Sequence, residues 1–261
     1  MNISLQGKTA VIGGSTQGIG LAIAQELATL GATCILLARN EQSLQAVTAA
    51  LPTPYQQQHS YKVADFAHPD QVRQVITAIV AANPVHILVN NTGGPPPGPI
   101  TDAAEDAFLA AFNQHIICNQ ILVKAVIPGM KEAAYGRIIN VISTSVRIPV
   151  KNLGVSNTIR GATASWAKTM SNELAAFGIT VNNILPGYTK TQRLDSLIQN
   201  NAARRNVAPA VIEEEMLKEI PAKRFGDAAE LAAVAGFLAS PAAAYVNGVS
   251  IPVDGGKTGT I

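Results

Sequence analysis

Short apolar runs alternate with longer segments of helical spacing along almost the whole chain. The runs are rich in β-branched residues and are bounded by Gly, Pro, Asn or Asp, which is typical of buried strands. They read TAVIGG, TCILLA, SYKVA, HILVN, RIINVI, TVNNIL and VSIPV. Between them, apolar residues spaced by three and four predict helices over 19–30, 41–50, 69–82, 102–132, 155–177 and 228–238. This alternation predicts an α/β fold with a doubly wound parallel sheet of about seven strands and helices on both faces.

Two segments depart from this alternation. NNTGGPPPGPI follows the fourth predicted strand, and its prolines exclude a helix. The second segment, 186–225, is a long excursion between a strand and a helix. Because doubly wound folds bind ligands at the carboxyl ends of their strands, we expect both segments to shape a substrate pocket. No break in composition separates a second domain, so residues 1–261 are predicted to form one domain.

Composition narrows the class of protein. The chain is 48% hydrophobic and 14% charged, which supports a sizeable core, and its net charge of +2 gives no field that favours nucleic acid or an anionic membrane. Cys34 and Cys118 lie in separate apolar segments and are expected to be reduced core residues. No signal core and no apolar run of about 20 residues is present. We therefore expect a cytoplasmic protein that acts on a small molecule, without a metal site.

The first predicted strand leads directly into a glycine-rich turn and a helix, in the stretch GGSTQGIG. Glycines allow a tight turn there and let backbone N–H groups approach a pyrophosphate at the helix N-terminus. A glycine-rich turn alone is common, but its position between the first strand and a helix favours nucleotide binding. The residues predicted to contact the nucleotide in this turn are Gly14, Thr16, Gln17, Gly18, Ile19 and Gly20.

The spacing Gly-x-x-x-Gly-x-Gly resembles that of the short-chain dehydrogenase/reductase family, and four further motifs follow in the family's order. ADF at 64–66 resembles the segment whose Asp contacts adenine, and NNTG at 90–93 resembles Asn-Asn-Ala-Gly with Thr92 replacing alanine. PGYTKT at 186–191 resembles the loop that covers the nicotinamide amide, and VDGG at 253–256 resembles the C-terminal signature.

The resemblance covers the chain from about Gly7 to Gly256. It implies a Rossmann fold like that of the 3-oxoacyl-acyl-carrier-protein reductases, in a divergent member of the family. The cofactor contacts that it implies are Asp65, Phe66, Asn91, Thr92, Gly93, Arg160, Pro186, Gly187, Thr189 and Thr191.

The end of the second strand, LLARN, bears on the choice of cofactor. An NAD enzyme usually offers a carboxylate there to the ribose 2′-hydroxyl, whereas this chain has Ala38 followed by Arg39. Arginine pairs with a 2′-phosphate through two N–H groups, so NADP(H) is favoured over NAD(H). The alternative is that Arg39 is only a solvated loop residue.

The resemblance also locates the catalytic residues. In the family, a tyrosine supplies or takes the proton while a hydride moves between nicotinamide and a carbonyl carbon. A lysine four residues later lowers the pKa of that tyrosine and binds the ribose, a serine orients the substrate oxygen, and an asparagine holds a water. The positions of serine, tyrosine, lysine and asparagine are occupied by Ser143, Ser156, Arg160 and His115. Asn113 and Asn119 lie close to His115, so a slip in register there stays open.

Ser156 and Arg160 do not reproduce the tyrosine–lysine chemistry. An aliphatic hydroxyl is far less acidic than a phenol with a pKa of about 10, and arginine does not release its proton at neutral pH. His115 could donate a proton, directly or through water, or merely satisfy a neighbour. Tyr188 could swing its hydroxyl into the vacated space or pack as a lid. Finally, Ser143, Ser156 and Arg160 could form a cradle that polarises a carbonyl, with water supplying the proton and Arg160 also anchoring the ribose.

Three functions are compatible with these residues. The favoured one is an atypical NADP(H)-dependent reductase of a ketone or a 3-oxoacyl-like carbonyl. The alternatives are a non-redox lyase, aldolase or dehydratase that uses the cradle, and a catalytically silent NADP(H)-binding protein. The family resemblance implies a homo-oligomer, a dimer or a tetramer, formed through the fourth and fifth helices.

Overall fold

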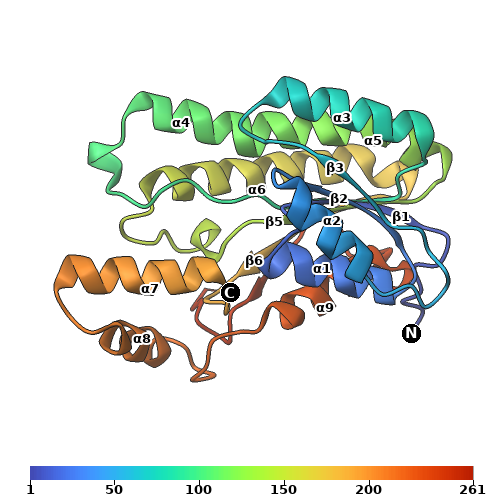
Figure 1. The fold of residues 1–261 in the computed structure, drawn as a ribbon. Coiled ribbons are helices and arrows are strands. Elements are labelled where there is room, and N and C mark those ends of the chain that lie inside the picture. Colours follow the sequence, from blue (N-terminus) through green and yellow to red (C-terminus); the bar gives the residue numbers. More distant parts are fainter. Residues whose placement is uncertain (261) are drawn as a thin grey trace.

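A computed structural model describes residues 1–260, in which seven parallel strands form one sheet (Figure 1). The strand order is β3-β2-β1-β4-β5-β6-β7, so the direction of winding reverses between β1 and β4. In doubly wound folds this reversal point is where ligands bind, beyond the carboxyl ends of the strands. The strands are β1 (Thr9–Gly13), β2 (Thr33–Ala38), β3 (Ser60–Val63), β4 (Ile87–Asn90), β5 (Gly136–Val141), β6 (Ile179–Pro186) and β7 (Ser250–Val253).

Helices cover both faces of this sheet (Figure 1). Successive side chains of a strand point to opposite faces, and in β1 Ile12 packs with α1, α2 and α9 while Val11 packs with α3, α5 and α6. Each face therefore has its own apolar core. The helices are α1 (Gly18–Thr29), α2 (Glu41–Ala50), α3 (Pro69–Ala82), α4 (Glu105–Phe112), α5 (Cys118–Glu132), α6 (Gly154–Leu174), α7 (Gln192–Arg205), α8 (Pro209–Lys218) and α9 (Ala228–Ala239).

The structure confirms the predicted fold class, and most element boundaries agree within one or two residues. Cys34 and Cys118 are buried and unpaired, as expected of core cysteines. In residues 1–260 no helix has the length and apolarity to cross a lipid bilayer.

The single helix predicted over 102–132 is wrong. A 3-10 turn, Ile100–Asp102, is followed by extended backbone at Ala103 and Ala104, and α4 begins only at Glu105. Between α4 and α5 the chain forms a π-helical segment, Asn113–Ile117. The side-chain spacing hardly changes across one widened turn, so periodicity alone does not reveal it.

The excursion over 186–225 forms α7 and α8, which extend from the same end of the molecule as α4 (Figure 1). Leu194 and Ile198 of α7 pack against Ile212 and Met216 of α8, and Phe225 closes this small apolar cluster. The excursion thus has its own core and forms a wall beside the carboxyl ends of the strands.

Candidate active site

The turn after β1 is a backbone cradle in which side chains have no room. Gly14 and Gly18 have φ of 57° and 56°, a region that favours glycine. A Cβ at Gly20 would lie 2.1 Å from the Gly14 carbonyl oxygen and 2.6 Å from Asn91 Nδ2. Asn91 Nδ2 in turn donates to the carbonyl oxygens of Gly13 and Gly14, each at 3.2 Å. The end of β4 therefore fixes the shape of the turn.

The N-terminus of α1 opens toward this cradle. Gln17 precedes the helix and makes no side-chain cap, and the first turn of α1 holds no acidic residue. Its N–H groups are thus available to an anion at the positive end of the helix dipole. Thr191 reaches over the turn, with its Cγ2 3.2 Å from where a Cβ of Gly18 would stand. These features fit the diphosphate of a dinucleotide.

The ends of β2 and β3 complete the nucleotide side. Arg39 is exposed directly after β2, and within residues 1–260 it has no carboxylate within 4.0 Å. Asp65 is held in its loop, where its N–H donates to Gln71 Oε1 at 2.9 Å and its Oδ1 accepts from the Ala67 N–H at 3.0 Å. Phe66 is buried in the core beneath the β1 turn, so its side chain packs inward.

A chain of buried amides ties the strands together next to the site. Asn90 Nδ2 donates to Asn140 Oδ1 at 2.8 Å, and Asn140 Nδ2 donates to Asn183 Oδ1 at 2.9 Å. Asn183 Nδ2 then donates to Ser250 Oγ at 3.0 Å. This chain crosses β4, β5, β6 and β7, and such a network rigidifies the strands whose ends carry the site.

His115 lies in the π-helical segment and is only 2% exposed. Its Nδ1 is 2.8 Å from Thr92 Oγ1, and its Nε2 has no hydrogen-bond partner within residues 1–260. Burial and the nearby charges of Arg160 and Arg193 lower the pKa of His115 to about 3. The imidazole is therefore neutral at pH 7. Asn119 is also buried, whereas Asn113 is exposed.

Ser143 follows the carboxyl end of β5, and Arg160 reaches the same strand end from α6, which also carries Ser156. Ser143 caps a 3-10 turn, and its Oγ accepts from the Ser145 N–H at 3.1 Å. Ser156 and Arg160 are buried one turn apart on α6, so they share a helix face. Arg160 Nη1 donates to the Val141 carbonyl oxygen at 3.0 Å. Burial and the charge of Arg193 lower the pKa of Arg160 to about 10, so it keeps its proton at pH 7.

The loop after β6 is fixed by short contacts within itself and with the chain after β7. Thr191 caps α7, and Thr189 Oγ1 donates to the Gly187 carbonyl oxygen at 3.2 Å. A Cβ at Gly187 would lie 2.5 Å from Asp254 Cβ, so the loop that begins with Pro186 packs closely against the VDGG segment.

Tyr188 packs toward the α7–α8 cluster. Its ring meets that of Phe225 edge to face, with centroids 6.3 Å apart, and Lys257 Nζ lies 4.7 Å from the centre of the Tyr188 ring. Burial raises the pKa of the Tyr188 hydroxyl. This position fits the lid interpretation and gives no support to a proton donor.

Arg193, in the first turn of α7, is a site residue that the sequence motifs did not indicate. Its Nη1 donates to the Gly94 carbonyl oxygen at 3.4 Å, and its charge acts on both Arg160 and His115. The sequence does carry a signal, because a basic residue two positions after the PGYTKT loop, in the first turn of the next helix, opposes the helix dipole. No group of His, Cys, Asp and Glu in residues 1–260 is arranged to hold a metal ion.

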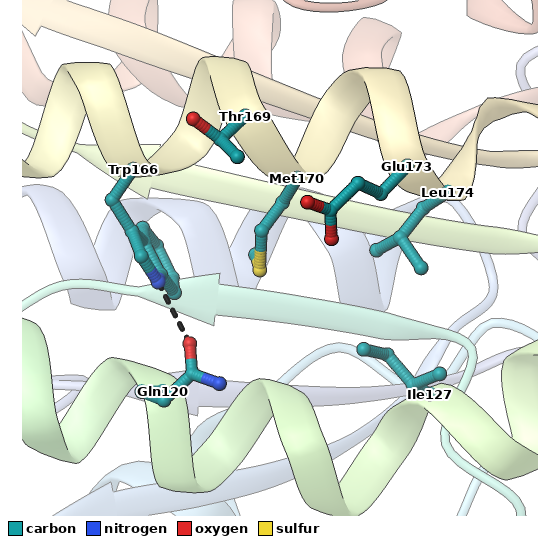
Figure 2. A pocket seen from close by; sticks show the side chains of 7 residues that line it. All are labelled: Gln120, Ile127, Trp166, Thr169, Met170, Glu173 and Leu174. Carbon is teal, nitrogen blue, oxygen red and sulfur yellow. Dashed lines mark hydrogen bonds between the residues drawn. The ribbon is translucent and has the colours of Figure 1, made fainter.

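A separate hollow lies between α5 and α6, lined by Trp166, Met170 and Leu174 from α6 and by Gln120 and Ile127 from α5 (Figure 2). Trp166 Nε1 donates to Gln120 Oε1 at 2.8 Å across it. None of the residues described above as nucleotide-binding or catalytic lines this hollow, so it is distinct from the candidate active site.

Comparisons with known proteins show which reductases the chain resembles. The family model described as enoyl-(acyl carrier protein) reductase matches residues 14–258. The chain is 29% identical to the NADPH-dependent reductase BacG of Bacillus subtilis, over 97% of this chain and 99% of that protein. It is 33% identical to the 3-oxoacyl-[acyl-carrier-protein] reductase FabG of Pseudomonas aeruginosa, over 97% and 98%. The structure of L-sorbose reductase from Gluconobacter frateurii, complexed with NADPH and L-sorbose, matches with a TM-score of 0.93, 29% identity and full coverage of both chains.

Proposed function

Since the chain belongs to the short-chain dehydrogenase/reductase family, we propose that it is an atypical NADP(H)-dependent reductase of a ketone or a 3-oxoacyl-like carbonyl. The relatives named above as NADPH-dependent or NADPH-bound support this choice of cofactor. The observation that carries the proposal is the position of Arg160. This residue lies on the same face of α6 as Ser156, and its buried guanidinium binds the carbonyl oxygen of Val141 at the end of β5.

The residues of the nucleotide side fit NADP(H). The cradle formed by Gly14 and Gly20 and the open N-terminus of α1 would hold the diphosphate. Arg39 would bind the 2′-phosphate, because its guanidinium is exposed and free of carboxylates in the described chain. When bound, the reduced nicotinamide supplies a hydride to the carbonyl carbon.

The reaction side would act by electrostatics. Ser143 and Ser156 donate hydrogen bonds to the substrate oxygen, and the charge of Arg160 stabilises the negative charge that develops on it. Arg160 also anchors the nicotinamide ribose. The proton that the oxygen takes up comes from water, because neutral His115 and Arg160 both hold their protons at pH 7. His115 then acts as a positioning residue that orients Thr92 and a water molecule.

The test is NADPH consumption with a panel of ketones, 3-oxoacyl thioesters and oxo acids. We expect turnover with at least one class, and a loss of about 100- to 1,000-fold in kcat/KM for Arg160→Ala, the usual effect of removing an oxyanion donor. Arg204→Ala is the matched control, because Arg204 is an exposed arginine on α7 that contacts Asn201. NADPH binding without turnover of any carbonyl contradicts the proposal.

A non-redox lyase, aldolase or dehydratase is the second candidate. The low pKa of His115 favours such an enzyme. With His115 neutral, no group near Ser156 and Arg160 replaces the acidic tyrosine of the family. Such an enzyme would convert its substrate without consuming NADPH. A Ser156→Tyr/Arg160→Lys double variant that reduces carbonyls and loses no other activity excludes it. A silent NADP(H)-binding protein would show binding alone.

We also propose a cytoplasmic homo-oligomer, a dimer or a tetramer, with a small-molecule substrate and no nucleic-acid partner. The hollow between α5 and α6 supports the contact, because the half-buried side chains of Trp166 and Ile127 line it where the family's helices pack (Figure 2). Light scattering tests the state, and Trp166→Glu is expected to shift it toward the monomer.

A further inference from the structure

Two arginines from different helices converge on one glycine beside the active site. A Cβ at Gly94 would lie 2.8 Å from Arg193 Nη2 and 3.3 Å from Arg160 Nη2. Arg160 comes from the buried face of α6, and Arg193 comes from the first turn of α7. Their guanidinium groups therefore share one small volume above the loop that follows β4.

Neither of these arginines has an acidic partner. Elsewhere Arg205 pairs with Glu215 and Arg224 pairs with Glu230 through two hydrogen bonds each. In the described chain no carboxylate lies within 4.0 Å of Arg160 or Arg193, and each is seen to donate only to a backbone carbonyl oxygen. Since a guanidinium has five N–H donors, most of their donors remain free.

The arrangement of the two arginines is electrostatically unfavourable. Two like charges stand together, and the charge of Arg193 helps to lower the pKa of Arg160. Arg193 also lies at the positive end of the α7 dipole. The neighbouring His115 is 2% exposed and leaves Nε2 without a partner in the described chain. An anion bound here would neutralise the positive charge and accept hydrogen bonds from the free donors.

We propose that Arg193, supported by the charge of Arg160, binds the carboxylate of the substrate, so that the enzyme reduces an oxo acid in preference to a neutral ketone. The inference rests on the proposed function. Carboxylates match the fork of a guanidinium, and Ser156 lies one helical turn from Arg160, about 5–6 Å between Cβ atoms. The proposal covers 2-oxo and 3-oxo acids, in which the carbonyl lies close to the carboxylate. The carbonyl carbon gains the hydride of NADPH, which is oxidised to NADP⁺, and its oxygen gains a proton from water.

A phosphate of the cofactor is the other source of an anion. The cradle after β1 and Arg39 already serve the cofactor's phosphates from β1 and β2, whereas Arg160 and Arg193 lie with Ser156 and His115. The carboxylate is therefore assigned to the substrate.

Calorimetry on the NADP⁺-loaded protein tests the site with malonate as the probe. We expect Arg193→Met to weaken malonate binding at least tenfold while NADPH affinity stays within threefold. Arg204→Met, which removes a charge from the exposed end of the same helix, should leave both unchanged. In turnover, 2-oxo and 3-oxo acids should exceed their methyl esters at least tenfold in kcat/KM, and this ratio should fall toward one in Arg193→Met.

The other outcomes separate the two proposals. If Arg193→Met weakens NADPH as much as malonate, the anion is a cofactor phosphate and the carboxylate site is overturned. Inorganic phosphate binding as tightly as malonate overturns the preference for a carboxylate. Turnover of neutral ketones without malonate binding overturns the site and leaves the proposed function standing. Arg193-dependent malonate binding without any reduction of oxo acids supports the site and contradicts the reductase function.

Discussion

The nucleotide side and the reaction side of the active site are built in different ways. Around β1 and α1 the proposed cofactor contacts come from the backbone. There Gly20 approaches Gly14 so closely that no side chain fits between them. Around β5 and α6 the proposed substrate contacts come from side chains, of which Ser156 and Arg160 are the central pair. A site made of backbone tolerates few changes, because each residue is fixed by contacts with its neighbours. A site made of side chains can change its chemistry while the fold stays intact.

The largest expected effect comes from damaging the backbone cradle. Gly20→Ala places a Cβ 2.1 Å from the Gly14 carbonyl oxygen, so the turn must move. We expect NADPH affinity to fall by about 100-fold or more, equivalent to ~3 kcal/mol of lost cradle contacts. Fluorescence titration measures it. In the control Gly161→Ala, the new Cβ meets nothing within 4 Å outside its own helix, and a gain of about 1 kcal/mol in stability is expected.

Arg39→Ala tests the cofactor choice within the nucleotide side. Loss of a charge-assisted contact to the 2′-phosphate should weaken NADPH by roughly 2–3 kcal/mol, or about 30- to 150-fold, and leave NADH unchanged. Titrations with both cofactors give the ratio, with Arg73→Ala, at an exposed arginine of α3, as the control. An equal loss of affinity for both cofactors would mean that Arg39 does not bind the 2′-phosphate.

His115 links the reaction side to stability at acid pH. Its pKa is about 3 in the folded protein and about 6.5 in an unfolded chain. As pH falls below 6.5 the unfolded state binds this proton first, so stability is lost on acidification, and above pH 7 the effect vanishes. Between pH 7 and pH 5 the native protein should lose about 2 kcal/mol more than His115→Gln. Urea unfolding at both pH values measures the difference, and equal losses would show that His115 charges freely in the fold.

Tyr188 should give the smallest change. Its ring packs against Phe225, so Tyr188→Phe keeps the packing and removes only the hydroxyl. We expect kcat/KM to change by less than about threefold, since Tyr188 is half-buried and packs as a lid. Tyr188→Ala removes the ring and should destabilise the protein by roughly 2 kcal/mol. A 100-fold loss of kcat/KM in Tyr188→Phe would instead show that the Tyr188 hydroxyl acts as the proton donor.

Much of the fold could be predicted from the sequence, and the reason is visible in particular elements. The strands are short apolar runs buried on both faces, as in TCILLA, and their helices end near glycine or proline. The glycine turn was equally readable, because Gly14 and Gly20 leave no alternative residue. The break over 103–104 and the π-helical segment leave no mark in the sequence, since the apolar spacing continues across both.

The electrostatics of the site could not be predicted in the same way. The low pKa of His115 depends on burial and on two arginines that are distant in sequence. Arg193 joins Arg160 only because the excursion after β6 folds back over Gly94. Long-range contacts of this kind leave no periodic mark in the chain.

Transfer of deuterium from C4-deuterated NADPH to the product is the most direct test of a reductase that has lost its tyrosine. Oxo acids and ketones are incubated with the labelled cofactor, and the products are analysed by mass spectrometry. We predict one deuterium on the former carbonyl carbon with the native protein. In Arg160→Ala, transfer should fall about 100-fold or more at saturating NADPH. Undiminished transfer in Arg160→Ala, or NADPH binding with no deuterium in any product, would contradict the account.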